Sequence, residues 1–302
     1  MRKSLSFSLP IALTVLIAIM LHACKKEESE TLTPAEEEQA AVAIATAEAE
    51  MEFAFNDVFD NVLGVNGELG IPGAGIFGRF ANRSGVERTD SMACFHVSIS
   101  PLQIGVFPKT VTLDFGSGCS TLGHTRSGKI TTVYTGRLVV PGSSATTTFD
   151  NYSIDNLTVS GTFKITNTAP AGTLQKQFTV EITDARITRP DGSYAQWSSE
   201  RTEKQVEGNG TETHKDDIFT ITGSGHGQVK SGNLIVLWNS KIVEPLIKKF
   251  ICRWMVKGQV QTRRETLPAG SPWEATLDYG TGNCDSKATL TMNGQTREIS
   301  LR

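Results

Sequence analysis

The sequence lacks the residue patterns that mark a catalytic site, a metal site or a nucleic-acid interface. His96, His124, His214 and His226 show no paired metal-ligand spacing, and none of them lies near a recognisable nucleophile motif. The basic residues are dispersed along a chain whose formal net charge is -3, which excludes the basic footprint of a nucleic-acid-binding protein. We therefore expect a protein that is not an enzyme and has no nucleic-acid partner.

Two motifs resemble ligand sites but lack residues that those sites require. Residues 123–129 have the spacing of a phosphate-binding P-loop, but Ile130 stands where the magnesium-binding hydroxyl is needed, and a strand pattern follows where a helix should begin. Asp114 and Asp278 each precede Gly-x-Gly, and one aspartate per copy supplies too few hard ligands for calcium. These patterns predict strand ends and tight turns, with no nucleotide, metal or other cofactor. The G-S-G-H-G segment at 223–227 predicts a turn rather than a nucleophile elbow.

Long apolar runs are also scarce, and the one at residues 9–20 is too short to span a bilayer comfortably. A basic pair near the start of the chain precedes this run, so residues 1–23 predict a signal peptide. The run closes on L-H-A-C at 21–24, which resembles the lipobox of bacterial lipoproteins. That resemblance implies that the thiol of Cys24 carries a diacylglycerol anchor, which makes the membrane a partner through this lipid.

Residues 24–33 are the predicted tether between the anchor and the folded body. No aspartate follows Cys24, and this absence implies the outer membrane rather than retention in the inner membrane. The K-K-E-E-S-E run at 25–30 resembles the short acidic signal that sends Bacteroidota lipoproteins to the outer face of that membrane, and a solvated tether is the alternative. We expect a lipid-anchored protein of the outer membrane that faces the cell exterior.

Basic residues are absent from a long acidic segment at the start of the mature chain. No lysine or arginine occurs between Glu27 and Gly78, so an acidic arm precedes a mildly basic body. This asymmetry favours docking of the arm on the body, or contact of the body with anionic surface glycans.

One helix is predicted over residues 34–63. Residues 33–36 form a capping box with proline at the first helical position, and Gly64 is expected to be the left-handed residue that ends the helix. Apolar residues recur at helical spacing along one stripe, with glutamates on the other faces: Ile44, Met51, Phe55, Val58, Phe59 and Val62. The stripe predicts packing against the rest of the protein, and a partner helix or a membrane surface are the alternatives.

The remainder of the chain predicts a mainly β protein. Residues 34–89 combine the acidic helix with a glycine-rich apolar loop, and residues 90–302 form a single all-β domain. Period-two patterns and turn signals predict about eleven strands in a large antiparallel meander. Long strands of this kind coil into a half-barrel, a barrel or a sandwich, and the pattern does not choose between them. The tryptophans are expected in the core rather than in a carbohydrate or lipid site; they are Trp197, Trp238, Trp254 and Trp273.

A cysteine-flanked unit occurs twice in the chain. The segment T-L-D-F-G-S-G-C at 112–119 recurs as T-L-D-Y-G-T-G-N-C at 276–284, and another cysteine precedes each copy. We interpret the copies, at about 94–136 and 252–294, as a duplicated β-hairpin. An envelope location permits disulfide bonds in both copies.

The repeat selects one disulfide pairing from the three that the cysteines left after lipidation allow. Each of the pairs Cys94–Cys119 and Cys252–Cys284 flanks its own predicted turn, so these are the expected bridges. Strict pairing about the first turn would set apolar residues opposite serines, and we therefore expect a bulge to offset the register. The two copies are expected to lie beside one another, where they would protect the edges of the sheet.

Several segments together resemble a family of Bacteroidota outer-membrane and surface lipoproteins. They are the acidic helix ending in F-N-D-V-F-D-N-V, the P-K-T-V-T-L-D-F-G run, the R-S-G-K-I and Y-T-G-R segments, and T-F-D-N-Y. The similarity covers most of the mature chain, and it implies location and construction but no activity, because the family carries no established catalytic residues. The segment D-S-M at 90–92 also resembles the acceptor of Bacteroidota O-glycosylation, with Ser91 as the glycosylated residue.

These observations predict a non-enzymatic binding or structural module on the cell surface, with surface glycans or other envelope proteins as partners. The alternative is a periplasm-facing envelope factor whose curved sheet shelters a lipid or another apolar ligand. A hydrolase that acts on glycans or peptides is the third hypothesis.

Overall fold

The computed structural model describes residues 32–71, 75–79, 94–211, 214–267 and 274–301. Cys24 and Ser91, the predicted lipidation and glycosylation sites, lie outside these residues, as does the predicted signal peptide. Trp273 also lies outside them.

One antiparallel sheet of 14 strands makes up most of the described chain. Its strands are β1 (His96–Ser100), β2 (Lys109–Asp114), β3 (Cys119–Thr121), β4 (His124–Tyr134), β5 (Ser144–Ile154), β6 (Leu157–Asn167), β7 (Gln177–Thr188), β8 (Tyr194–Glu207), β9 (Ile218–Ser231), β10 (Leu234–Lys249), β11 (Met255–Arg264), β12 (Ala275–Thr281), β13 (Lys287–Met292) and β14 (Gln295–Ser300). They follow one another across the sheet in chain order, except that β3 pairs only with β4. The predicted antiparallel meander is confirmed, whereas the expected number of about eleven strands was too low.

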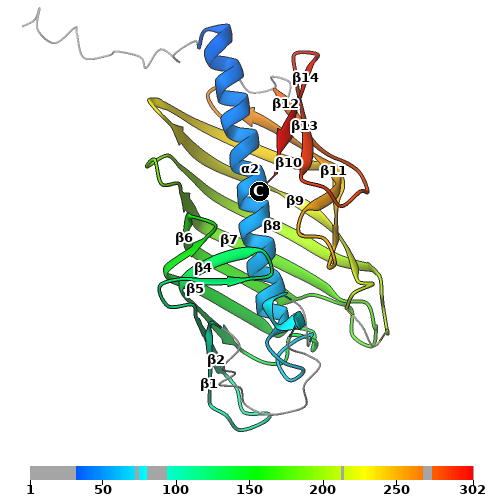
Figure 1. Ribbon diagram of the computed structural model, residues 1–302. Helices are drawn as coiled ribbons and strands as arrows, with labels where there is room; N and C mark the ends of the chain where they lie inside the picture. Colours follow the sequence, from blue (N-terminus) through cyan, green and yellow to red (C-terminus); the bar gives the residue numbers. More distant parts are fainter. Residues whose placement is uncertain (1–31, 72–74, 80–93, 212–213, 268–273, 302) are drawn as a thin grey trace, which may run out of the picture.

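The sheet is not closed into a barrel. It curves around a single long helix, α2 (Pro34–Gly64), which runs lengthwise across the concave face (Figure 1). We call the side of the sheet that meets α2 the inner face, and the opposite side the outer face. A short 3-10 helix, η1 (Gly75–Arg79), follows α2 and packs near its end.

The start of α2 follows the predicted capping box. The Thr33 hydroxyl accepts a hydrogen bond from the Glu36 backbone, the Glu36 carboxylate accepts one from the Thr33 backbone, and proline follows at the first helical position. The end differs from the prediction, because Gly64 is the last helical residue and Val65 after it keeps a right-handed conformation with φ -53°. The chain therefore leaves α2 without a left-handed residue, and the Ile71 amide bonds the Leu63 carbonyl at 2.6 Å.

Burial of α2 is more complete than one apolar stripe would give. Glu48, Glu50 and Glu52 are 0%, 2% and 4% exposed, although their spacing suggested solvated faces. The expectation of a single buried stripe was therefore wrong, because the curved sheet covers the helix on several sides. Aromatic side chains fill the space between the layers, as where Phe59 meets Phe178 and Phe219 in edge-on contacts.

Glycines in β9 make room for the largest side chains of the core. A Cβ on Gly225 would lie 2.5 Å from Nε1 of Trp197, and one on Gly227 would lie 2.6 Å from the ring of Trp238. Trp197 and Trp238 are 1% and 0% exposed, so the predicted core position of these two tryptophans is confirmed. The turn predicted at 223–227 is wrong, because the segment lies within β9 and its glycines serve inter-strand packing.

The two cysteine-flanked copies lie at opposite ends of the strand order, so the expectation that they are neighbours was wrong. The first copy supplies β1 to β4 and the second supplies β11 to β13. Their connections nevertheless both reach Phe53 of α2: the ring of His124 lies 5.0 Å from the Phe53 ring, and the guanidinium of Arg253 lies 5.7 Å from it. Residues at the start of β4 and just before β11 thus meet at the helix, although the two copies do not pair in the sheet.

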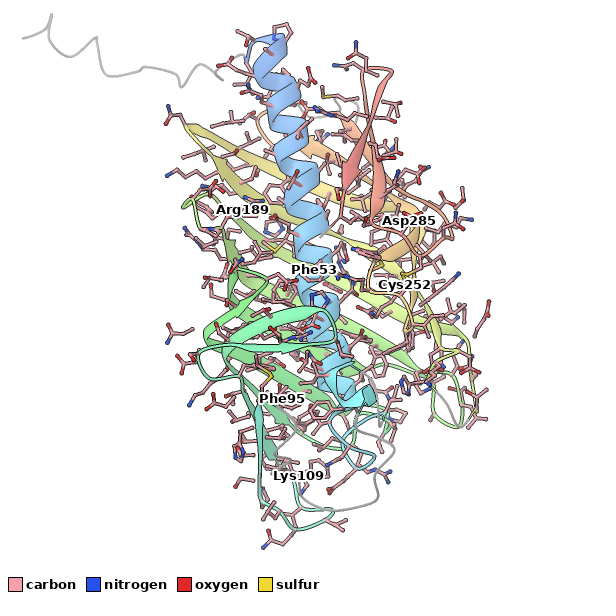
Figure 2. The ribbon with its side chains drawn as sticks, viewed as in Figure 1. Phe53, Phe95, Lys109, Arg189, Cys252 and Asp285 are labelled. Carbon is pink, nitrogen blue, oxygen red and sulfur yellow. A yellow bond between two sulfur atoms is a disulfide. The ribbon has the colours of Figure 1, made fainter. Side chains whose placement is uncertain are left out.

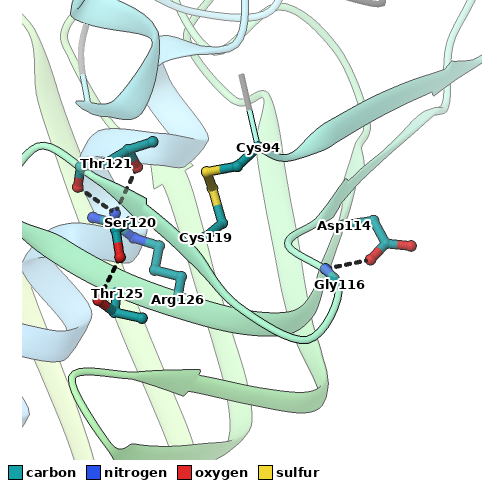
Figure 3. The surroundings of a disulfide bond; sticks show 8 residues. All are labelled: Cys94, Asp114, Gly116, Cys119, Ser120, Thr121, Thr125 and Arg126. Atoms are coloured by element: carbon teal, nitrogen blue, oxygen red, sulfur yellow. Dashed lines mark hydrogen bonds between the residues drawn. A yellow bond between two sulfur atoms is a disulfide. The ribbon is translucent and has the colours of Figure 1, made fainter. Parts of the chain in front are cut away.

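Both predicted cysteine pairs are joined, Cys94 to Cys119 and Cys252 to Cys284. The expected bulge is absent from the β1–β2 ladder, whose register is continuous from His96 opposite Asp114. The register shift between the two cysteines of this pair is instead taken up by the turn that separates β2 from Cys119 (Figure 3).

The repeated aspartates close turns, as the sequence predicted. The Asp114 carboxylate accepts a hydrogen bond from the Gly116 amide at 2.9 Å, and Asp278 does the same for Gly280 at 2.8 Å (Figure 3). Asp114 thereby satisfies a backbone donor just beyond β2. Asp278 and Gly280 both lie within β12, so the strand end predicted at Asp278 comes a few residues later.

Candidate functional site

Ion pairs join α2 to the inner face of the sheet. From one end of the helix to the other they are Glu37–Arg264, Glu38–Arg297, Glu50–Arg189, Glu52–Arg201, Asp57–Arg126 and Asp60–Lys248. Every acid belongs to the helix and every base to the sheet or its turns, so the acidic arm is docked on the basic body. Figure 2 shows Arg189 beside the upper half of α2 and Phe53 near its middle.

The most deeply buried part of this interface contains several ionisable groups. Trp238 Nε1 donates a hydrogen bond to Glu48 Oε1 at 2.6 Å, and the Arg201 guanidinium lies 4.5 Å from the centre of the Trp197 ring. Arg201 also pairs with Glu52 at 2.5 Å. A guanidinium held between a carboxylate and an aromatic face is well compensated for its burial.

Burial shifts the protonation of the carboxyl groups in this region. It raises the pKa of Glu203 to about 8 and that of Asp60 to about 6, although Lys248 opposes both shifts. Burial also raises the pKa of Glu48, against the hydrogen bond from Trp238. Near neutral pH, Glu203 is therefore largely protonated and adds no full negative charge to the core.

Converging carboxyl groups suggest catalysis only where a substrate can reach them. Glu48 and Glu52 of α2 and Glu203 of β8 are 0%, 4% and 4% exposed between the helix and the sheet, where a substrate does not reach them. They hold the two layers together, at the cost of leaving Glu48 Oε2 and Glu203 Oε2 without hydrogen bonds among the described residues.

A polar hollow lies on the outer face of the sheet, across β7 to β11. It has a volume of about 650 Å³. We call it the outer depression, and its outward-facing lining residues are Glu181, Thr183, Ser198, Glu200, Ser224, His226, Asn239, Lys241 and Arg263. Neighbouring strands set these side chains in cross-strand rows, with Ser198, His226 and Asn239 in one row and Glu200, Ser224 and Lys241 in the next.

The chemistry of the outer depression is that of hydrogen bonding. It combines hydroxyl, amide, imidazole, carboxylate and ammonium groups, with both signs of charge. Ser224 and His226 share this surface but are not hydrogen-bonded to one another within the described chain, so they do not form a nucleophile–base pair there. Such a lining suits a ligand rich in hydroxyl groups better than an apolar one.

A second hollow, of about 600 Å³, lies beside the N-terminal half of α2. Its charged residues are largely committed to the helix interface: Glu38 pairs with Arg297 at 3.3 Å, and Arg189 pairs with Glu50 at 2.5 Å. The outer depression is the better candidate because the ion pairs named above between α2 and the sheet do not involve its lining residues.

No protein-family model, curated protein or solved structure matches the chain. The functional assignment therefore depends on the residues and geometry of this chain.

The histidines singled out in the sequence lie far apart in the structure. His96 is exposed on β1 and His226 lies in the outer depression. Nδ1 of His124 lies 2.7 Å from Oδ2 of Asp155, where burial tends to raise the pKa of Asp155 but the hydrogen bonds from His124 and the backbone lower it overall. Among the described residues no cluster of three histidine, cysteine, aspartate or glutamate side chains is placed to hold a metal ion.

Sequence reasoning did not identify Arg201, Glu203 and Lys248 as core residues. The available signal was the alternation in β8. Its first inward-facing residues are Ala195 and Trp197, and the inward-facing residues that follow in the same alternation are polar. An acidic helix without bases requires basic partners elsewhere, and this second signal could have directed attention to them. Within the described chain, no helix combines the length and the apolar character needed to cross a membrane.

Proposed function

We propose that the protein is a lipid-anchored module of the outer membrane that faces the cell exterior and binds a hydroxyl-rich ligand, such as a surface glycan, without catalysing a reaction. The observation that carries the binding role is the outer depression, a polar hollow built from five adjacent strands. The lipobox-like segment at 21–24 supports the anchor at Cys24. The acidic run at 25–30 supports the outward orientation.

The rigidity of the scaffold supports a binding role. The lining residues stand on long strands whose inner face is fixed to α2, so their positions are set before a ligand arrives. Preorganised polar groups lose little conformational entropy on binding. A purely structural module is the second form of the same proposal, with other envelope proteins as partners.

Two other functions are less well supported. A periplasmic factor that shelters a lipid would need its concave face for the ligand, and α2 occupies that face (Figure 1). A hydrolase would need carboxyl groups within reach of a substrate, and the converging ones lie under the helix. The protease experiment below separates the periplasm-facing alternative from the main proposal.

The ligand experiment uses two lysines of equal chemistry. Lys241 lines the outer depression, whereas Lys204 is an exposed outward residue of the neighbouring region of β8 that does not line it. Binding of the purified protein to a panel of neutral and acidic glycans should fall several-fold in Lys241→Ala and stay at the parental level in Lys204→Ala. Equal binding by both variants and the parent would refute a ligand site in the depression.

Anchoring and orientation have a separate test. Cys24→Ser should release the protein from the outer-membrane fraction, and protease added to intact cells should digest the anchored parent. A Cys24→Ser variant that still sediments with salt-washed membranes would contradict the lipid anchor. Protection of the parent from protease on intact cells would favour the periplasm-facing alternative.

A further inference from the structure

The connection between β1 and β2, residues 101–108, exposes aliphatic side chains at the end of the protein where α2 terminates (Figure 1). Leu102, Ile104 and Val106 are 62%, 88% and 46% exposed. No charged residue occurs between positions 97 and 108. We call residues 101–108 the apolar loop, and we propose that it inserts into the interfacial region of a lipid bilayer.

A buried lysine fixes the apolar loop from inside. Lys109 is 1% exposed, and its Nζ donates hydrogen bonds to the carbonyls of Pro101 at 2.8 Å and Gln103 at 2.6 Å. The Glu68 carboxylate lies 3.6 Å from the same ammonium and accepts a hydrogen bond from the Gly105 amide at 2.7 Å. Figure 2 marks Lys109 at this end of the molecule. The loop therefore holds its aliphatic side chains outward before it meets anything, and insertion orders little additional chain.

The hydrogen bonding of the apolar loop suits lipid better than a protein groove. Inside a bilayer, backbone polar groups need partners within the protein. Lys109 and Glu68 already supply several of them, the Val106 amide bonds the Gln103 carbonyl at 3.3 Å, and Pro101 and Pro108 have no amide hydrogen to satisfy. A convex aliphatic tip also needs no matching pocket in a fluid bilayer, whereas a protein partner would have to provide one.

The adjacent connection enlarges this surface. Lys109 pairs with Tyr134 across β2 and β4, so the β4–β5 connection begins beside the apolar loop. That connection exposes Val139 and Val140, at 42% and 47%. Neighbouring exposed apolar residues of this kind mark interaction surfaces. The exposed Arg137 lies in the same connection, where its charge suits the headgroups of an anionic bilayer.

The position of the loop restricts how an anchored protein can lie, and this step rests on the proposed lipid anchor at Cys24. At 1.5 Å per residue α2 is about 46 Å long. An extended tether over positions 24–33 reaches only about 35 Å. Both ends can therefore touch the same bilayer only if α2 is tilted away from the membrane normal rather than standing upright on the membrane.

The test places a depth-sensitive probe in the loop of the full lipidated protein. Ile104→Trp and the control Val243→Trp are reconstituted into phosphatidylethanolamine–phosphatidylglycerol vesicles with and without brominated acyl chains. Val243 is 42% exposed on β10, between Lys241 and Glu244, so the control is an exposed aliphatic with charged neighbours. Bromolipid should quench the fluorescence of the introduced tryptophan in Ile104→Trp at least about twofold, because its indole reaches the acyl boundary. The fluorescence of the introduced tryptophan in Val243→Trp should stay unchanged.

A second variant separates insertion from anchoring. Adding Leu102→Asp to Ile104→Trp should abolish the quenching while the protein still floats with the vesicles through its lipid. Both loop positions are exposed, so folding should be retained, as checked by circular dichroism melting.

Each other outcome contradicts a defined part of the argument. Equal quenching of both tryptophan variants, quenching of neither, or quenching that survives Leu102→Asp would overturn insertion. An Ile104→Trp emission that responds to an added envelope protein but not to bromolipid would assign the loop to a protein partner and also overturn it. If the protein fails to float with the vesicles, only the lipid anchor is refuted. Quenching of the unanchored Ile104→Trp protein at excess lipid would then still test whether the loop inserts.

Discussion

The protonated state of Glu203 gives the most specific test of the helix–sheet interface. This side chain is 4% exposed on the inner face of β8, and burial raises its pKa to about 8 from a usual value of 4.5. Its charged neighbours are Lys248 and Arg201, which favour the ionised form, and Asp60 and Glu52, which oppose it. The variant Glu203→Gln keeps the shape of the protonated carboxyl group and removes its titration.

The sign of the effect follows from the raised pKa. Between pH 4.5 and 8 the folded protein holds a proton at Glu203 that the unfolded chain has lost, so this group stabilises the fold at low pH and loses that contribution as pH rises. At about 1.4 kcal/mol for each unit of pKa, the parent should lose on the order of 3 to 4 kcal/mol from this site between pH 5 and pH 8. Asp60 contributes in the same direction at lower pH, since its pKa is raised to about 6.

Urea unfolding monitored by tryptophan fluorescence at pH 5 and pH 8 measures this difference. Glu203→Gln should flatten the pH dependence and be more stable than the parent at pH 8. Glu207→Gln, an exposed glutamate at the end of the same strand, should keep the parental dependence. An unchanged pH dependence in Glu203→Gln, or a variant less stable than the parent at pH 8, would refute a protonated Glu203.

Three further changes test the packing and the cross-links. Gly227→Ala should destabilise the protein by about 1 to 3 kcal/mol or more in urea, because a Cβ there would clash with the Gln196 carbonyl oxygen and lie 2.6 Å from the Trp238 ring. Asp57→Ala should cost about 3 to 5 kcal/mol and lower the melting temperature by several degrees, since it leaves the 1% exposed Arg126 guanidinium without its carboxylate. Cys252→Ser should lower stability by about 3 to 4 kcal/mol under oxidising conditions and leave it unchanged under reducing conditions, because the bridge closes a separation of 32 residues.

Controls for these changes come from the same chain. Gly118→Ala should be nearly neutral, because no atom lies within 4 Å of a Cβ at that position. Asp114→Asn should alter stability only modestly, since Asp114 is paired with the exposed Lys129 and caps a turn at the surface. If Gly118→Ala lowered the free energy of unfolding as much as Gly227→Ala, the packing argument would be contradicted.

The sequence predicted the local signals of this fold well. The capping box at Thr33, the turn role of Asp114 and both disulfide pairings depend on neighbouring residues, and the structure contains all three. Period-two patterns were sufficient for the antiparallel meander because most of the long strands alternate between buried and more exposed residues. Short strands such as β3, with only three residues, carry too little pattern to be recognised.

The errors concern features that depend on distant parts of the chain. The glycines at 223–227 were read as a turn, because nothing nearby shows that Trp197 and Trp238 need the space above them. The repeats were expected side by side, although similarity of two segments does not state how many strands separate them. The outer depression is assembled from five strands and has no local motif, so the sequence analysis singled out only Ser224, Gly225 and His226 among its lining residues, within the G-S-G-H-G segment.

The enclosure of α2 has a consequence for how the protein reaches its native state. The helix is made first, yet its partners arrive late: Trp238 lies 190 residues beyond Glu48, and Arg297 lies 259 residues beyond Glu38. Contacts of such high sequence separation slow folding, because loop-closure entropy is lost before the contacts form. Glu48 and Glu38 therefore lack these partners until most of the chain has been synthesised. If the chain crosses a membrane before it folds, as the proposed lipid anchor requires, all of it is available when the sheet begins to close around its first element.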